Sequence, residues 1–84
     1  MDIHLRAFES WILNNPLHKW RMDASPHRSL QYVASRMKVT RETIRNWECG
    51  NTDVQMKNIK KLGRIVSDES FVAKWSAWLE ERPE

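Results

Sequence analysis

The sequence predicts a single all-α domain of five helices that spans residues 1–84. Apolar side chains recur at helical spacing in five segments of the chain, and no segment indicates a strand. Only two glycines and three prolines are present, which suits helices better than a many-stranded sheet. A chain of 84 residues is also the size of one compact domain.

The first part of the predicted fold is a helix, a loop and a second helix. The first helix is expected to begin after Asp2 as its N-cap and to end before Pro16, because proline disfavours helical geometry in the preceding residue. Residues 16–28 show no clean period and contain two prolines, so we expect an ordered loop there. Ser29 is the expected N-cap of the second helix. The core positions of that helix are Leu30, Val33, Ala34 and Met37.

A third helix is expected to begin after the N-cap Thr40 and to end near Gly50. Only a short break at Lys38–Val39 separates it from the second helix. A tight turn between two amphipathic helices is typical of a helix-turn-helix. We therefore place the core of such a motif at residues 29–50.

Two further helices complete the predicted fold. The pair Thr52 and Gln55 has the spacing of a capping box and is expected to open the fourth. Either Ser67 or Asp68 is expected to cap the fifth, over about residues 68–81. The apolar positions of the fourth helix are Met56, Ile59, Leu62 and Ile65 or Val66. Those of the fifth are Phe71, Val72, Trp75, Trp78 and Leu79.

Basic side chains are concentrated in the middle of the chain. The net charge is +3, but residues 28–64 hold nine basic and three acidic groups, whereas residues 1–27 are balanced. Residues 65–84 hold two basic and five acidic groups. A neutral start, a basic middle and an acidic end favour one face that meets a polyanion, although an ordinary solvated surface would also be basic.

Several classes of protein are not indicated. Cys49 is the only cysteine, so no internal disulfide is possible, and a lone thiol suits the reducing cytoplasm, where we expect the protein. No apolar run approaches the ~20 residues of a membrane span, and the first residues lack a secretory pattern, so we expect no membrane partner. The histidines lack metal-ligand spacing and no catalytic constellation is evident, so we expect no enzyme, cofactor or metal site.

One face of the third predicted helix carries four long polar side chains. Ile44 and Trp47 lie on its core-facing side at helical spacing. The opposite side carries Arg41, Glu42, Arg45 and Asn46. Arginine can donate two parallel hydrogen bonds to guanine, asparagine can pair similarly with adenine, and a carboxylate can accept from cytosine. This choice of side chains points to the major groove of DNA.

Residues 29–50, SLQYVASRMKVTRETIRNWECG, resemble the Cro/C1-type (XRE-like) helix-turn-helix family of phage and bacterial repressors. The family pattern is a Thr/Ser cap, an apolar-Ala pair, Gly-Val-Ser at the turn, Thr-Ile, and Trp-Glu-x-Gly. These positions here read Ser29, Val33-Ala34, Lys38-Val39-Thr40, Thr43-Ile44 and Trp47-Glu48-Cys49-Gly50. Met56, Ile59 and Leu62 match the fourth helix of the family, and the resemblance implies a five-helix lambda-repressor-like fold.

The resemblance also implies roles for individual residues on double-stranded DNA. The expected base-reading residues are Arg41, Glu42, Arg45 and Asn46. The expected contacts to the DNA backbone are Ser29, Lys38, Thr40, Thr43, Lys57 and Lys60. Two departures stand out: Lys38 replaces the turn glycine, which would place a side chain in the left-handed region at some cost, and Leu30 replaces a frequent glutamine that contacts phosphate.

The fifth predicted helix carries more apolar area than a terminal helix needs, and exposed apolar patches usually mark a partner surface. We expect a homodimer that associates through Phe71, Trp75, Trp78 and Leu79. The alternative is that the two tryptophans of this helix complete the core of a monomer by packing on Phe8 and Trp11.

The expected function is that of a sequence-specific transcriptional regulator, a Cro-like repressor of a phage or mobile element. Two alternatives remain open. A DNA-packaging or recombination accessory, or an antitoxin, would use the same fold. A protein-interaction module would use the first and fifth helices as partner surfaces, because five tryptophans in 84 residues is a high content and tryptophan is enriched at interface hot spots.

Overall fold

The computed structural model describes residues 3–83, and this part of the chain is all-α. The predicted all-α class is therefore confirmed, but the predicted number of five helices is wrong. The helices are α1 (Ile3–Leu13), α2 (Pro16–Met22), α3 (Leu30–Met37), α4 (Arg41–Glu48), α5 (Met56–Val66) and α6 (Phe71–Glu80). The predicted N-cap Asp2 lies outside the described residues.

The additional helix is α2, which lies where an ordered loop was predicted. Pro16 occupies the start of this helix, where its missing N–H costs nothing and its fixed φ already suits helical geometry. The side chain of Asn15 caps it, since its Oδ1 accepts hydrogen bonds from the backbone N–H groups of Leu17 and His18 at 2.9 and 3.0 Å. Proline therefore ends one helix and begins the next.

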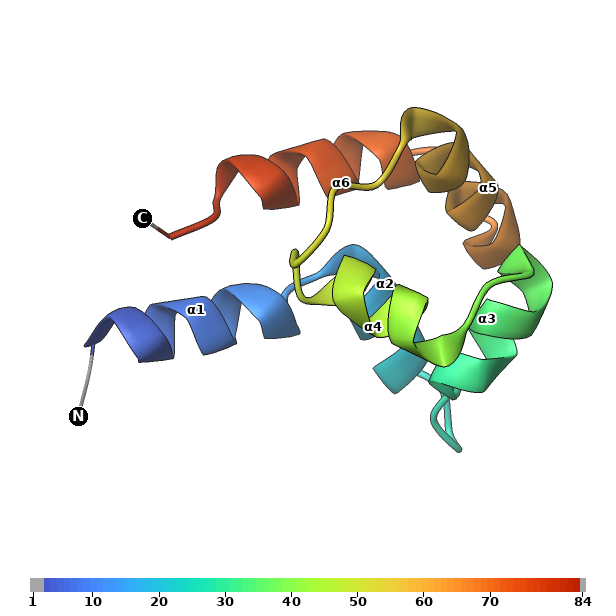
Figure 1. Ribbon diagram of the computed structural model, residues 1–84, viewed down its shortest axis with the longest axis horizontal. Coiled ribbons are helices and arrows are strands. Elements are labelled where there is room, and N and C mark those ends of the chain that lie inside the picture. The colour runs from blue at the N-terminus through green and yellow to red at the C-terminus, as the bar shows by residue number, and fades with distance from the viewer. Residues whose placement is uncertain (1–2, 84) are drawn as a thin grey trace.

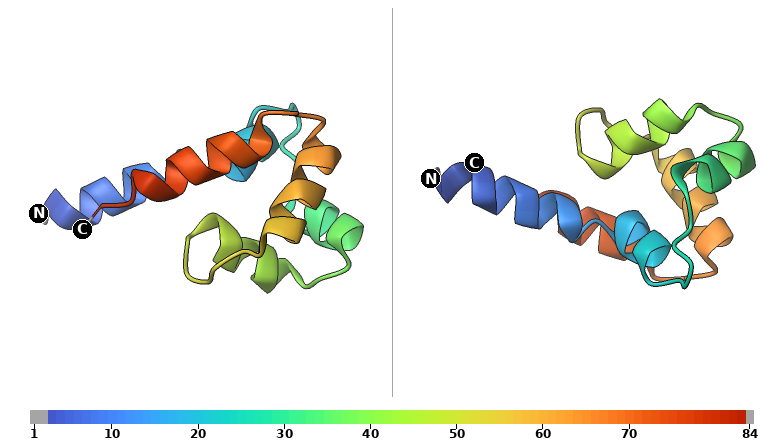
Figure 2. Two further views of the ribbon diagram at one scale, coloured as in Figure 1. Left: turned by 90° about the horizontal axis from the view of Figure 1, so that it is seen from above. Right: turned by 90° about the horizontal axis from the view of Figure 1, so that it is seen from below.

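The helices form an elongated molecule of 38 × 26 × 21 Å. In Figures 1 and 2, α1 and α6 run side by side toward one end, where both termini lie, and α3 and α5 occupy the other end. A stack of two indoles joins α1 to α6: the rings of Trp11 and Trp78 are parallel, with centroids 4.1 Å apart. Each indole N–H also donates to the backbone carbonyl of the other residue.

This packing corrects the predicted dimerisation surface. Phe71, Trp75 and Trp78 are 2%, 1% and 3% exposed within a single protomer, so the wide apolar stripe of α6 is largely used by the core. Of the four residues predicted to form the surface, only Leu79 is exposed. Trp78 stacks on Trp11, as the alternative interpretation predicted. The sequence could not separate the two interpretations because both require the same apolar spacing.

Three of the predicted helix boundaries are correct, and each rests on a local signal. Ser29 and Thr40 are the N-caps of α3 and α4, and each hydroxyl accepts a backbone hydrogen bond. Lys38 adopts the left-handed conformation (φ 60°) that its place at the turn predicted. Gly50 follows α4 with φ 71°, and a Cβ there would lie 2.5 Å from Cη2 of Trp11, so only glycine fits both requirements.

The predicted starts of the last two helices are wrong. The side chain of Thr52 makes no capping bond, and α5 begins at Met56 with Gln55 as an N-cap that has no side-chain hydrogen bond. Met56 was predicted as an apolar position of this helix, but it is 49% exposed and lies outside the core. Ser67 ends α5 in the left-handed region, and α6 begins only after Ser70.

Asp68 stabilises the connection between α5 and α6 rather than capping α6. Its carboxylate accepts hydrogen bonds from Nζ of Lys74 at 2.6 Å and from the hydroxyl and backbone N–H of Ser70 at 2.7 and 2.9 Å. These bonds, that from Lys74 first, lower the pKa of Asp68 from 3.8 to about 2. The carboxylate therefore stays ionised well into acid.

Candidate nucleic-acid interface

The connection of α3 to α4 fixes which side of α4 faces outward. Only residues 38–40 join the two helices, and α4 then lies against the core through Ile44 (0% exposed) and Trp47 (7%), as predicted. The opposite side of α4 is left to solvent. Arg41, Glu42 and Arg45 are exposed there, and Asn46 is half-buried.

The four predicted base-reading residues line one open groove between α4 and the start of α3. Ser29, a predicted backbone contact, lies on the same groove. Sequence reasoning missed the other residues of the lining, which are Arg21, Leu30, Gln31 and Asn51. The groove is polar and cationic. Arg41 and Arg45 line it, and Glu42 is the one acidic residue among its lining residues. The third arginine of the lining, Arg21, is paired with Glu48.

A buried ion pair holds α4 against α2 below this groove. Arg21 donates from Nε to Oε2 of Glu48 at 2.6 Å and from Nη2 to Oε1 at 2.7 Å. The two residues are only 7% and 4% exposed. Nη1 of Arg21 also donates to the backbone carbonyl of Arg28 at 3.0 Å, and Nδ1 of His18 lies 3.5 Å from Oε1 of Glu48. A two-bond contact of this kind fixes the orientation as well as the position of α4.

The pair was not predictable from residue spacing. Glu48 belongs to the Trp-Glu-x-Gly pattern, but its partner lies 27 residues earlier, in a segment predicted to be a loop. The sequence indicated only that Glu48, a charged residue at a core-facing position of its helix, needs a partner of opposite charge. It did not indicate which residue that partner is.

The predicted backbone contacts are divided between different surfaces. The hydroxyls of Thr40 and Thr43 lie 2.9 Å apart at the start of α4, and Thr40 also accepts from the backbone N–H of Thr43 at 3.1 Å. Lys38 and Lys57 are exposed but do not line the groove. Lys60 lines a separate hollow beside Arg64 and Glu69, where α5 meets α6.

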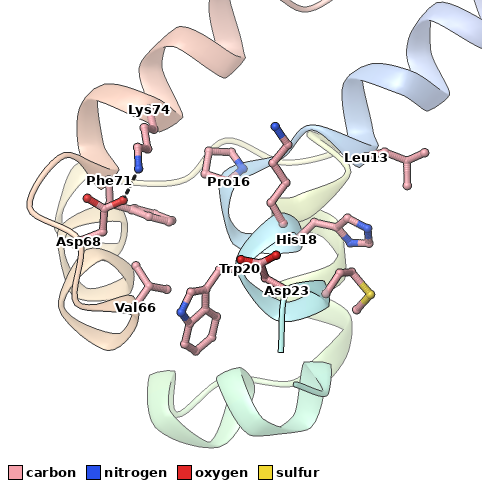
Figure 3. Close-up of a pocket in the computed structure, with 11 residues that line it drawn as sticks. Leu13, Pro16, His18, Trp20, Asp23, Val66, Asp68, Phe71 and Lys74 are labelled. Carbon is pink, nitrogen blue, oxygen red and sulfur yellow. Dashed lines mark hydrogen bonds and ion pairs between the residues drawn. The ribbon is translucent and has the colours of Figure 1, made fainter. Parts of the chain in front are cut away.

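A further hollow lies between α2 and the start of α6. Figure 3 shows Trp20 on one side of it and the Lys74–Asp68 ion pair on the other. Its charged residues have mixed signs, so it favours neither an anion nor a cation. In the described part of the chain, no three His, Cys, Asp or Glu residues are grouped as metal ligands. None of the helices described for residues 3–83 has the length and apolar content of a membrane-spanning helix.

No protein-family model, curated protein or solved structure matches this chain.

Proposed function

We propose that this protein is a sequence-specific double-stranded DNA-binding regulator of transcription, of the Cro-like helix-turn-helix kind. The observation that carries the proposal is that Arg41, Glu42, Arg45 and Asn46 all line one groove together with Ser29, the N-cap of α3. In this docking α4 enters the major groove and α3 crosses the phosphate backbone.

The dimensions and chemistry of α4 suit this docking. A helix with its side chains is about 10–12 Å across, and the major groove of B-DNA is about 12 Å wide. Arg41 and Arg45 are free to donate to guanine, Asn46 to pair with adenine, and Glu42 to accept from cytosine. Glu42 also opposes binding to phosphates alone, which favours sites where its hydrogen bond to a base is made.

The proposed biological role is that of a phage or mobile-element repressor that occupies an operator. A homodimer on a near-palindromic site, with two copies of α4 about 34 Å apart, is part of the proposal. Its interface must use exposed side chains such as Leu79, because Phe71, Trp75 and Trp78 are packed inside the protomer.

The tryptophan content no longer favours a protein-interaction module. Trp11, Trp47, Trp75 and Trp78 are each no more than 7% exposed, so the core accounts for four of the five tryptophans.

Substitutions on α4 and on α5 are expected to have different effects on DNA binding. Arg41→Ala and Asn46→Ala should each weaken binding to the preferred site by about 1–3 kcal/mol and relax the preference at a single base position. Lys57→Ala, the matched control, should weaken all sequences alike because a phosphate contact carries no base information. Affinities measured on a preferred duplex and on its single-base variants test this. An Arg41→Ala protein that weakens on every duplex by the same factor contradicts the docking.

A further inference from the structure

Four side chains form a row beside α3 in which two adjacent aromatic rings are flanked by an arginine on each side. The guanidinium carbon of Arg28 lies 4.0 Å from the ring centroid of Trp20, and that of Arg36 lies 4.3 Å from the centroid of Tyr32. The two rings lie next to each other, with centroids 6.2 Å apart. We call these four residues the cation–aromatic row. Trp20 comes from α2, and Tyr32 and Arg36 come from α3.

The ring of Trp20 contacts the outer side of α3 through Tyr32. Arg21 turns inward to Glu48. The cation that covers Trp20 is Arg28, which also donates from Nη1 to the backbone carbonyl of Trp20 at 2.9 Å.

The charges of the row are not neutralised within the part of the chain that the structure describes. Neither Arg28 nor Arg36 forms an ion pair with a carboxylate there. A guanidinium that stacks on a ring uses its face and leaves N–H groups at its edge for an anion. Arg36 and Tyr32 are both exposed, so the outer end of the row faces solvent.

The position of the row relates it to the groove on α4. Arg28 directly precedes Ser29, which lines the groove, and Gln31 lines it as well. On α3, Gln31 and Ser35 lie on one face of the helix, and a 3.0 Å hydrogen bond joins their side chains. Tyr32 and Arg36, each one residue later in the sequence, lie on the adjacent face. The row therefore flanks the groove across the width of α3.

The row is also held rigidly relative to α4. Arg21 donates to the backbone carbonyl of Arg28 and, through its other nitrogens, to Glu48 of α4. The backbone N–H of Arg28 donates in turn to the carbonyl of Arg21 at 2.9 Å. The backbone at Arg28, at one end of the row, is thus tied to α4, whose side chains line the groove.

We propose that the cation–aromatic row binds the phosphate backbone of the same DNA duplex, outside the segment that α4 reads. This inference rests on the proposed function, in which α3 is the helix that crosses the backbone. The row extends the contact at one edge of the site, and it adds affinity without adding base preference. The partner is duplex DNA because the row offers arginine edges for phosphates and no free carboxylate.

The test compares a long and a trimmed duplex. A duplex selected from a random pool by the wild-type protein is used with flanks of about 10 base pairs, one turn of B-DNA, and again with the flanks removed. Arg36→Ala should bind the long duplex about fivefold more weakly than the wild type at physiological salt, with a salt slope smaller by about 0.9, because one phosphate contact is lost. On the trimmed duplex the two proteins should bind equally.

Two further variants make the result specific to the row. Arg6→Ala removes the same charge from α1, at the other end of the molecule from α3, and should bind both duplexes like the wild type (Figure 1). Tyr32→Ala keeps Arg36 but removes the ring that orients it, and it should show a smaller loss on the long duplex only. Both side chains of α3 are exposed, and thermal unfolding of each variant confirms that the fold is retained.

The outcomes separate this inference from the proposed function. If the wild type binds the selected duplex but Arg36→Ala binds the long form equally well, the row has no DNA contact and the inference is overturned alone. An equal loss on the long and trimmed duplexes overturns it too, because the contact then lies inside the site. If the wild type selects no duplex at all, the proposed function fails and the inference fails with it.

Discussion

Glu48→Ala should lower the free energy of unfolding by about 3–5 kcal/mol, which is a large part of the stability of so small a domain. The substitution leaves the guanidinium of Arg21 buried, at 7% exposure, without the carboxylate that accepts two of its hydrogen bonds. An unpaired buried charge costs far more than the loss of an exposed ion pair. Urea unfolding followed by circular dichroism measures the effect.

Two comparisons show whether the cost arises from the buried charge. Arg21→Met combined with Glu48→Leu removes both charges and should recover most of the stability, since apolar side chains of similar volume can replace a buried ion pair. Lys74→Ala breaks the exposed pair with Asp68 and should have a much smaller effect than Glu48→Ala. If Glu48→Ala unfolds at the same urea concentration as the wild type, the ion pair does not hold α4.

Trp78→Ala should also lower the free energy of unfolding by about 3–5 kcal/mol, as truncation of a buried tryptophan does. The change removes the stack on Trp11 and the hydrogen bond of 2.7 Å from Nε1 of Trp78 to the carbonyl of Trp11. Because both contacts lie within one protomer, the loss should be the same at every protein concentration. Thermal or urea unfolding over a wide concentration range measures this.

Leu79→Ala is the matched control on the same helix. Leu79 is 45% exposed, so its truncation should cost the isolated protomer little. If the loss of stability in Trp78→Ala depends strongly on protein concentration, Trp78 stabilises an assembly rather than the protomer, and the packing described for α1 and α6 is wrong in solution.

The parts of the fold that sequence reasoning predicted correctly depend on local signals. The caps Ser29 and Thr40 are read from residue type and position, and Ile44 and Trp47 from helical spacing. Sequence reasoning missed α2 because its seven residues are too few to show a period and because a proline at position 16 also predicts the end of the preceding helix. Proline is also common at the first position of a helix. Asn15, a preferred N-cap residue directly before it, was the sequence signal that a helix begins at Pro16.

Contacts between distant segments could not be predicted in the same way. Trp11 and Trp78, which stack on each other, are 67 residues apart in the sequence. Residue spacing alone does not distinguish an apolar helix face that packs in the core of the protomer from one that contacts another protein. Within the groove, periodicity identified the four side chains of α4. Gln31 and Asn51 were missed because their place depends on how neighbouring segments lie against α4. Lys60, which stays a predicted phosphate contact, lies on α5 and lines a different hollow, a position that residue spacing does not predict.

We propose that α4 reads base sequence in duplex DNA. Selection of binding sites from a random duplex pool, repeated at low and at physiological salt, tests it most directly. We expect one enriched motif, and an affinity for it that falls steeply as salt rises, because Lys and Arg contacts release counterions from the phosphates. The same selection with Arg41→Ala should return a motif that is relaxed at one position. A pool that stays random after repeated rounds, or an affinity that does not change with salt, contradicts the claim.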